Sequence, residues 1–374
     1  MTPHSASLPR ILMTTDAVGG VWTYALDLAA GLRQHGVRTV LAAFGPEPAR
    51  SQRAQAAAID GLELVETGMP LDWTAAEPAE IGEAAAVVRG LARRYAVDLI
   101  HLNSPALAAG GPAPAPVLGA CHSCLATWWA AVREGPLPAD FRWRTRSLWE
   151  GLVACDALVA PSAAYAREVA RTYDLQPPSV VHNGVRQAVQ AIAPAERGVF
   201  TAGRLWDAGK NAQVFDAMAA RLPVPAQAAG PLESPTGERV ALRHATSLGL
   251  LSADEIARRL APRPVFVSTA LYEPFGLAVL EAALAGCPLV LSDIPTFREL
   301  WDGTAVFADP RDPYAFAEAA QALLDDPEAA REAGRAAQAQ ARRYSLEAMT
   351  LGVLELYARL APARFRTRVK EAAE

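Results

Sequence analysis

The amino-acid sequence predicts an α/β protein with two doubly wound parallel sheets, and three observations carry that prediction. Short apolar segments alternate with helix-like segments along almost the whole chain, which is typical of parallel sheets covered by helices on both faces. The length of 374 residues suits two domains of about 100 to 200 residues each. Residues 187–197 contain Ala and Pro but no apolar period, so they are the expected linker.

Each expected strand is a short apolar segment bounded by turn residues. Before the linker these are Ile11 to Thr15, Thr39 to Phe44, Leu62 to Glu66, Asp98 to Leu102, Val117 to Cys121, Ala157 to Ala160 and Val180 to His182. After it, the second sheet starts at Val199 and continues with Val224 to Ala228, Val265 to Ser268, Leu289 to Ser292 and Ala305 to Phe307. Helices are expected between the strands, and the chain ends in helices at Pro313 to Leu324, Glu328 to Arg343 and Leu346 to Leu360.

The most informative segment runs from Tyr272 to Gly286. Pro274 and Gly276 break the preceding strand, so a helix is expected to begin near Phe275 or Gly276, with backbone N–H groups that lack partners within the helix. Such a helix start suits an anion or sugar hydroxyls. Glu273 then lies in the loop and Glu281 about one and a half turns inside the helix. Both carboxylates can accept hydrogen bonds from a vicinal diol.

A second segment, from Gly198 to Asn211, ends a strand at Gly203 and places Arg204 and Lys210 in the following loop. Arg and Lys in such a loop form a plausible diphosphate clamp, because Arg offers a planar fork of donors and Lys a compact charge. The chain has only two lysines, Lys210 and Lys370. The presence of one of them in this loop supports a role in the clamp. The alternative is a solvated loop charge.

These two segments resemble the donor-binding signature of glycosyltransferase family 4, whose members are retaining enzymes with the GT-B fold. The resemblance implies that Glu273 approaches the donor sugar and that Glu281 holds the nucleotide ribose. It implies that the amides of Phe275, Gly276 and Leu277 meet sugar and phosphate. Gly203, Arg204, Leu205 and Lys210 match a second family pattern, with the lysine one residue later than expected.

The resemblance also implies the domain plan. Residues 1–190 are expected to form an acceptor-side Rossmann-like domain, residues 196–344 the donor-binding domain, and residues 345–374 a helical segment that returns to the first domain. The ligand would bind in the cleft outside the strand ends. Between Gly230 and Leu250 the chain is shorter than the family's usual strand, helix and strand. The pocket for the base, where Leu250 is expected, is therefore the least defined part.

In the first domain, Gly19 and Gly20 follow the first strand without the Gly-x-Gly-x-x-Gly spacing of a nicotinamide site. The resemblance implies that they face the diphosphate; the alternative is a tight turn made for packing. His101 and His122 end buried strands and are either core residues or polar site residues. The resemblance places His122 near the donor sugar and Asn103 where many members carry a second His.

Four of the eight tryptophans, Trp128, Trp129, Trp143 and Trp149, are interleaved with arginines. This cluster is expected to be an acceptor platform or a membrane-surface patch, or else ordinary helix packing. The acceptor itself is a saccharide, a lipid-linked molecule or a small molecule. A peripheral membrane contact is thus one of the expected options.

Composition narrows the function class. A formal net charge of -5 and a pI near 5.8 argue against nucleic acid as a partner, and no apolar run reaches the 18 or more residues of a membrane span. A cytoplasmic location is the expectation, because the first residues lack a signal-peptide pattern. Cys121 and Cys124 are expected to be free thiols, since no second pair of cysteines supports a zinc site.

The sequence therefore predicts a retaining hexosyltransferase that uses a nucleotide diphosphate sugar, with a UDP-sugar favoured over a GDP-sugar and no further cofactor. No Asp-x-Asp triplet occurs, so we expect Arg204, Lys210 and a helix dipole to carry the leaving-group charge without a metal. The alternatives are a GT-B sugar-nucleotide epimerase and a non-catalytic nucleotide-sugar binding protein.

Overall fold

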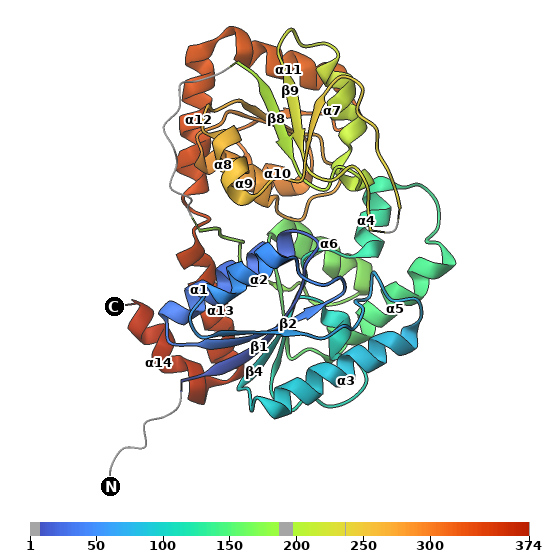
Figure 1. Cartoon of the computed structure of the whole chain (residues 1–374), viewed down its shortest axis with the longest axis vertical. Coiled ribbons are helices and arrows are strands. Elements are labelled where there is room, and N and C mark those ends of the chain that lie inside the picture. The colour runs from blue at the N-terminus through green and yellow to red at the C-terminus, as the bar shows by residue number, and fades with distance from the viewer. Residues whose placement is uncertain (1–7, 187–196, 236, 374) are drawn as a thin grey trace. The chain divides into compact units, whose positions relative to one another are not determined.

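The computed structural model describes residues 8–186, 197–235 and 237–373. Most of the expected linker therefore lies outside the described residues. The chain packs into two compact units (Figure 1). Among the described residues, the first unit comprises 8–129, 135–185 and 346–373, and the second comprises 130–134, 186, 197–235 and 237–345.

The first unit contains a seven-stranded parallel sheet in the order β3-β2-β1-β4-β5-β6-β7. Its strands are β1 (Arg10–Asp16), β2 (Arg38–Phe44), β3 (Leu62–Glu66), β4 (Leu99–Leu102), β5 (Val117–Ala120), β6 (Ala157–Ala160) and β7 (Ser179–Val180). The helical elements that the chain forms between or after these strands are α1 (Gly20–Gln34), α2 (Arg50–Ala57), α3 (Pro78–Arg94), η1 (Pro105–Ala108), α4 (Leu125–Val132), α5 (Ala139–Ala154), α6 (Ala163–Tyr173), α13 (Leu346–Leu360) and α14 (Pro362–Ala373).

The second unit contains a six-stranded parallel sheet in the order β10-β9-β8-β11-β12-β13. Its strands are β8 (Val199–Ala202), β9 (Ala226–Ala229), β10 (Thr246–Gly249), β11 (Val265–Ser268), β12 (Leu289–Ser292) and β13 (Val306–Ala308). Its helical elements are η2 (Ala208–Lys210), α7 (Ala212–Ala219), α8 (Ala253–Leu260), α9 (Leu277–Leu284), α10 (Pro295–Trp301), α11 (Pro313–Asp325) and α12 (Pro327–Ala341). Two parallel sheets of this kind confirm the predicted fold class.

The first sheet is buried on both faces because successive residues of a strand point to opposite sides. Ile11 and Met13 of β1 pack in one hydrophobic cluster with α1 and α13, whereas Leu12 packs in another with α3. All three are fully buried. Near-continuous apolar strands are what a doubly wound sheet requires.

Helix α13 belongs to the first unit although it follows the second sheet in sequence. Gly31 of α1 gives it room: a Cβ at this position would lie 2.1 Å from Thr350 Oγ1. Thr350 is itself fully buried and donates a hydrogen bond to the Leu346 carbonyl at 2.7 Å. The close approach of α1 and α13 therefore depends on a glycine.

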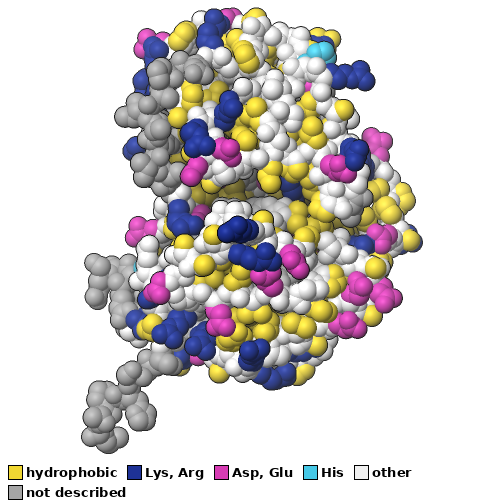
Figure 2. Space-filling model, viewed as in Figure 1, with side chains coloured by type: hydrophobic (Ala, Val, Ile, Leu, Met, Phe, Trp, Pro, Cys, Tyr) yellow, Lys and Arg dark blue, Asp and Glu magenta, His cyan; other side chains and the backbone are white. Residues whose placement is uncertain are grey.

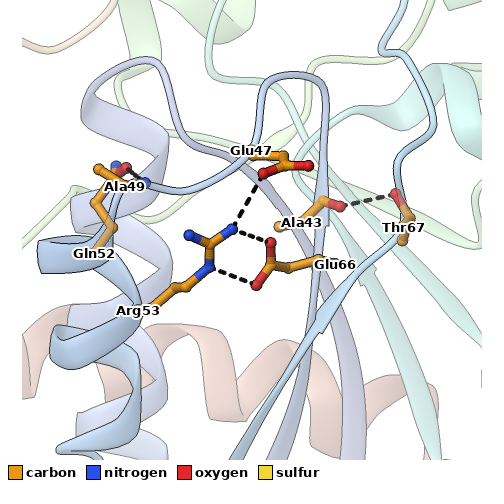
Figure 3. Close-up of polar contacts among 7 residues, drawn as sticks. All are labelled: Ala43, Glu47, Ala49, Gln52, Arg53, Glu66 and Thr67. Atoms are coloured by element: carbon orange, nitrogen blue, oxygen red, sulfur yellow. Dashed lines mark hydrogen bonds and ion pairs between the residues drawn. The ribbon is translucent and has the colours of Figure 1, made fainter.

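Polar contacts hold α2 against the edge of the first sheet, as Figure 3 shows. Arg53 Nε donates to Glu66 Oε1 at 2.8 Å and its Nη2 to Glu66 Oε2 at 2.6 Å, while Glu47 lies 3.4 Å from the same guanidinium. Gln52 accepts a hydrogen bond from the Ala49 amide and donates one to the Ala17 carbonyl. The side chain of Gln52 thus ties the start of α2 to the loop after β1.

The surface carries both signs of charge, and on the face that Figure 2 shows the basic and acidic side chains are interspersed. No helix in the described part of the chain is long and apolar enough to cross a membrane.

Candidate functional site

The order of the second sheet reverses at β8, which pairs with β9 on one side and β11 on the other. In an open parallel sheet, ligands bind outside the carboxyl ends of the strands at such a reversal. Gly203 and Arg204 leave the carboxyl end of β8, and Glu273 follows that of β11. The strand pairing therefore brings together the two segments that the sequence singled out.

Lys210 and Glu273 form an ion pair between these two loops. The lysine Nζ lies 2.5 Å from Glu273 Oε2, and the two side chains are 24% and 16% exposed. A partly buried pair is less screened by water than a surface pair. The lysine is thus held at the strand ends, although it comes one residue later than the resemblance led us to expect.

Arg204 is held by a carboxylate that the sequence analysis did not identify. Its Nη2 lies 3.2 Å from Asp207 Oδ2, and Asp207 Oδ1 accepts the Gly209 amide at 2.8 Å. Asp207 is 8% exposed. A short polar residue two positions before a glycine is a signal for a turn of this kind, so Asp207 could have been found from the sequence.

Asn211 and Thr269 fix the backbone of the lysine loop. Thr269 Oγ1 donates towards the Lys210 and Asn211 carbonyls at 3.2 and 3.0 Å. Asn211 adopts the left-handed conformation with φ 55°, and its side chain donates to the carbonyls of Thr269 and Pro310 at 3.0 and 2.7 Å. Because these bonds cross from one loop to another, local sequence spacing could not reveal them.

Helix α9 begins at Leu277, with Gly276 as its N-cap at φ 95°. The predicted start, near Phe275 or Gly276, is within one residue of this. The Phe275 ring is buried and packs edge-on against Tyr344 at 5.8 Å, so its side chain belongs to the core of the second unit. Glu281 lies inside α9 as expected and is half-buried.

The strand ends of the second sheet also enclose a small hollow of about 20 Å³, lined by residues that include Gly203, Lys210, Glu273 and Val279. Gly230, after β9, lies directly against Gly203: a Cβ on Gly230 would come within 1.8 Å of the Gly203 carbonyl oxygen. Its φ of +135° also favours glycine. Any side chain at Gly230 would displace the loop that carries Arg204.

Leu250, expected near the base, follows β10 and is 82% exposed. The preceding Gly249 carbonyl accepts the Gly230 amide at 2.7 Å, which joins the ends of β9 and β10. The exposed Leu250 side chain is thus available to a ligand at the same edge of the sheet.

In the first unit the strand order reverses at β1, which pairs with β2 and β4. Gly19 and Gly20 follow β1, and α1 starts at Gly20. The loop is held by Asp16, whose Oδ1 accepts the Val18 amide at 2.8 Å. His101 and Asn103 lie at the end of β4, so they and the glycine loop share one edge of this sheet.

The two histidines have different environments. His101 is fully buried and its Nδ1 lies 2.7 Å from the Tyr357 hydroxyl on α13. Burial, together with the neighbouring His122, lowers the pKa of His101 to about 3. His122 is half-buried, its Nε2 lies 2.8 Å from Asn103 Oδ1, and burial lowers its pKa to about 4. Both rings are therefore neutral at pH 7.

Two family profiles match successive parts of the chain. Residues 18–188 match Glycosyltransferase Family 4, and residues 232–340 match Glycosyl transferases group 1. The chain belongs to glycosyltransferase family 4.

Curated relatives of this family 4 chain cover only part of it. Glycogen synthase of Mycobacterium tuberculosis is 41% identical over 99 residues, which is 26% of this chain and 24% of the relative. The D-rhamnosyltransferase WbpZ of Pseudomonas aeruginosa is 33% identical over 129 residues, 32% of this chain and 34% of that protein. The alignments thus span a quarter to a third of the relatives' lengths.

Solved structures match nearly the whole family 4 chain and show that its fold is GT-B. Sucrose-phosphate synthase from Thermosynechococcus elongatus superposes with a TM-score of 0.77 at 18% identity, covering 95% of this chain and all (100%) of that one. Anabaena Alr3699/HepE in complex with UDP and glucose gives 0.73 at 19% identity, with 94% and 100% coverage.

The tryptophans on α4 take part in helix packing in the family 4 chain. The rings of Trp128 and Trp129 lie 6.4 and 5.5 Å from that of Phe141, and Trp129 Nε1 donates to the Gly135 carbonyl at 3.0 Å. Both residues remain half-buried.

The cysteines are free thiols, as expected, and Cys121 and Cys124 are buried. Burial raises the pKa of the Cys121 thiol, with smaller effects of Cys124 and Cys155. Within the described ranges, no group of three or more His, Cys, Asp and Glu residues is arranged to hold a metal ion.

Proposed function

We propose that this family 4 protein is a retaining glycosyltransferase that moves a hexose from a nucleotide diphosphate sugar to an acceptor. The observation that carries the proposal is the convergence of Arg204, Lys210 and Glu273 at the strand-order reversal of the second sheet. A UDP-sugar is the favoured donor and a GDP-sugar the second choice. The fold it shares with a structure that holds UDP and glucose supports this choice.

Arg204 and Lys210 are proposed to bind the diphosphate, together with the amides of Phe275, Gly276 and Leu277 at the start of α9. Without ligand, each cation already has a carboxylate partner, Asp207 for the arginine and Glu273 for the lysine. The formal charge of these four groups is therefore zero. A bound diphosphate must share the two cations with these carboxylates. Its affinity therefore depends on the attraction of the cations and on the repulsion of the carboxylates.

Glu281 is proposed to hold the ribose diol and Glu273 to approach the transferred sugar, while Leu250 lies beside the base. In the first unit, Gly19 and Gly20 are proposed to serve the diphosphate and His122 the sugar. Trp128 and Trp129 are assigned to the acceptor side, and so are His101 and Asn103, which are buried and would act through the residues they contact. The acceptor belongs to one of three classes: a saccharide, a lipid-linked molecule or a small molecule.

The proposed reaction breaks the bond between the anomeric carbon and the phosphate oxygen and forms one to the acceptor oxygen on the same face. The acceptor proton goes to the departing phosphate, so no protein nucleophile is needed. Arg204 and Lys210 stabilise the charge that develops on the leaving diphosphate. This neutralisation comes from side chains, so the proposal assigns no metal.

Steady-state kinetics of Arg204→Ala and Lys210→Ala test the proposal. We expect kcat to fall by roughly 100-fold to 1000-fold for Arg204→Ala and by a comparable or smaller factor for Lys210→Ala. Arg331→Ala is the matched control, because Arg331 also pairs with a carboxylate three residues away in the same unit. If the two variants raise KM for the donor and leave kcat intact, the residues only bind substrate.

Two alternatives predict different products. A sugar-nucleotide epimerase would convert the donor into its epimer without an acceptor, and a non-catalytic binding protein would not hydrolyse the donor even slowly. A thermal-shift panel of UDP-, GDP- and ADP-sugars followed by product analysis separates the three. The presence of both glutamates and both basic residues favours the transferase.

A further inference from the structure

The orientation of the Asn103 amide is fixed by Thr14 of β1. Asn103 Nδ2 lies 2.7 Å from the Thr14 carbonyl oxygen, and the Asn103 backbone amide donates to Thr14 Oγ1 at 2.9 Å. A backbone carbonyl can only accept, so the NH₂ group of Asn103 must face Thr14. The side-chain oxygen, Oδ1, then faces His122.

This orientation determines where the proton of His122 resides. Asn103 Oδ1 lies 2.8 Å from His122 Nε2, and an amide oxygen can only accept a hydrogen bond. Nε2 must therefore carry the hydrogen. Because the ring is neutral at pH 7, Nδ1 keeps its lone pair and is an acceptor. Nδ1 makes no hydrogen bond to any residue in the described ranges.

His122 differs in this respect from His101. His101 Nδ1 is occupied by the Tyr357 hydroxyl, and its Nε2 is enclosed by protein without a hydrogen-bond partner among the described residues. Tyr24 packs edge-on against His122 with the ring centroids 4.5 Å apart, which restricts rotation of the imidazole. Of the two rings, the half-buried His122 is therefore the one that can meet a ligand.

We propose that Asn103 is a positioning residue that holds His122 in the Nε2–H tautomer, so that Nδ1 accepts a hydrogen bond from a hydroxyl group of the bound donor. The ligand part of this proposal rests on the proposed glycosyl transfer. The tautomer part rests only on the contacts of Thr14, Asn103 and His122. The site would thus favour a ligand hydroxyl that donates over an ether or carbonyl oxygen at the same place.

Long-range proton–nitrogen NMR of ¹⁵N-histidine-labelled protein tests the tautomer directly. His122 is assigned by the loss of its signals in His122→Gln. We expect a protonated Nε2 and an unprotonated Nδ1 in the wild type, and a mixture of tautomers in Asn103→Ala. Thr67→Val is the matched control, because Thr67 donates a hydrogen bond to the Ala43 carbonyl at the same end of the sheet. Its tautomer signals should match the wild type. A protonated Nδ1 in the wild type would overturn the proposal.

Donor kinetics test the ligand part. Asn103→Ala should lower kcat/KM for the donor by roughly 3-fold to 10-fold, the effect of misplacing one hydrogen bond, while Thr67→Val should not. His122→Asn, whose amide reaches the position of Nδ1, should retain more activity than His122→Gln. Equal activity of Asn103→Ala and wild type would overturn the ligand part and leave the proposed transfer intact. A wild type with the predicted tautomer that turns over no sugar nucleotide would overturn the transfer and the ligand part together.

Discussion

The ion pair of Lys210 with Glu273 places a carboxylate 2.5 Å from a cation assigned to the diphosphate. That carboxylate has two opposing effects. It orients the lysine, and it repels a bound nucleotide diphosphate. Loss of its charge should therefore strengthen nucleotide binding, whereas loss of its hold on Lys210 should slow the proposed transfer.

The first prediction separates those effects. In Glu273→Gln we expect tighter binding of UDP, by about 1 kcal/mol or roughly fivefold, because one repulsive charge is removed. Turnover should fall at the same time. Calorimetric titration with UDP, next to a donor assay, measures both, with Glu318→Gln on the exposed face of α11 as the control. Weaker UDP binding in Glu273→Gln would contradict this account of the pair.

Asp216 of α7 anchors the segment before β10. The second prediction concerns its contribution to the free energy of unfolding. Its carboxylate accepts the backbone amides of Arg243 at 3.0 Å and of His244 and Ala245 at 2.8 Å, and the residue is 8% exposed. We expect Asp216→Asn to lower the free energy of unfolding by about 2 kcal/mol, because the neutral amide loses the charge-assisted hydrogen bonds and its NH₂ group would face the Arg243 amide at the position of Oδ2.

The pH dependence of that loss checks its cause. Burial favours the protonated form, but the amides of Ala245, Arg243 and His244 outweigh it and lower the pKa of Asp216. The stabilisation is therefore present above the unfolded-state pKa of about 3.9 and is lost as the pH falls through the folded-state pKa. Denaturant titrations should show wild type and Asp216→Asn converging in acid. A gap that stays constant with pH would point to packing instead.

At the residue scale, the sequence singled out the groups that are proposed to face a ligand, but few of the groups that hold their loops. Arg204, Lys210 and Glu273 are proposed because their spacing resembles a family pattern. The residues that hold these loops could not be predicted, apart from Asp207 with its turn signal. Asn211 and Thr269 act through backbone atoms of a distant loop, and only the pairing of β8 with β11 brings those atoms together.

Elements with strong apolar patterns were predicted almost to the residue, as α13 at Leu346–Leu360 shows. The strand β10 was missed because Thr246–Gly249 has a single large apolar side chain and forms an edge strand. Helix α14 lies within the helical segment expected at residues 345–374, but its separation from α13 was not predicted, since Pro362–Ala373 is rich in Arg and weakly apolar. Edge and surface elements bury too little to leave a clear pattern.

The third prediction concerns the contact between α1 and α13. Gly31→Ala should destabilise the first unit by about 1 kcal/mol or more, because the clash with Thr350 outweighs the gain of about 1 kcal/mol in helix propensity. Thr350→Ala in the same chain should recover stability. A double-mutant cycle from denaturant unfolding measures the coupling. Additive effects of the two substitutions would show that the helices do not meet as described.

At the scale of the whole molecule, two parallel sheets each present polar and glycine residues at the reversal of strand order. The sequence predicted both sheets from alternation and length. It could not give the strand order, which depends on contacts between distant segments, and the order is what brings β8 beside β11.

The fourth prediction concerns metal dependence. Turnover should be the same in excess EDTA as with added magnesium, because Arg204 and Lys210 supply the charge that neutralises the diphosphate. The assay compares initial rates in one buffer with either addition. Activity that is lost on chelation and restored by magnesium or manganese would require a metal at the diphosphate.

The central claim is that the second sheet binds a nucleotide diphosphate sugar with Glu281 on the ribose, and calorimetric titration with UDP, GDP and ADP tests it most directly. The wild type should bind one of the three nucleotides. Glu281→Gln should bind it more weakly by about 1.5 to 3 kcal/mol, which is the contribution of hydrogen bonds to a charged group. The control Glu318→Gln should bind it with the affinity of the wild type. Thermal unfolding confirms that both variants are folded. Unchanged affinity in Glu281→Gln, or a wild type that binds none of the three nucleotides, would contradict the account.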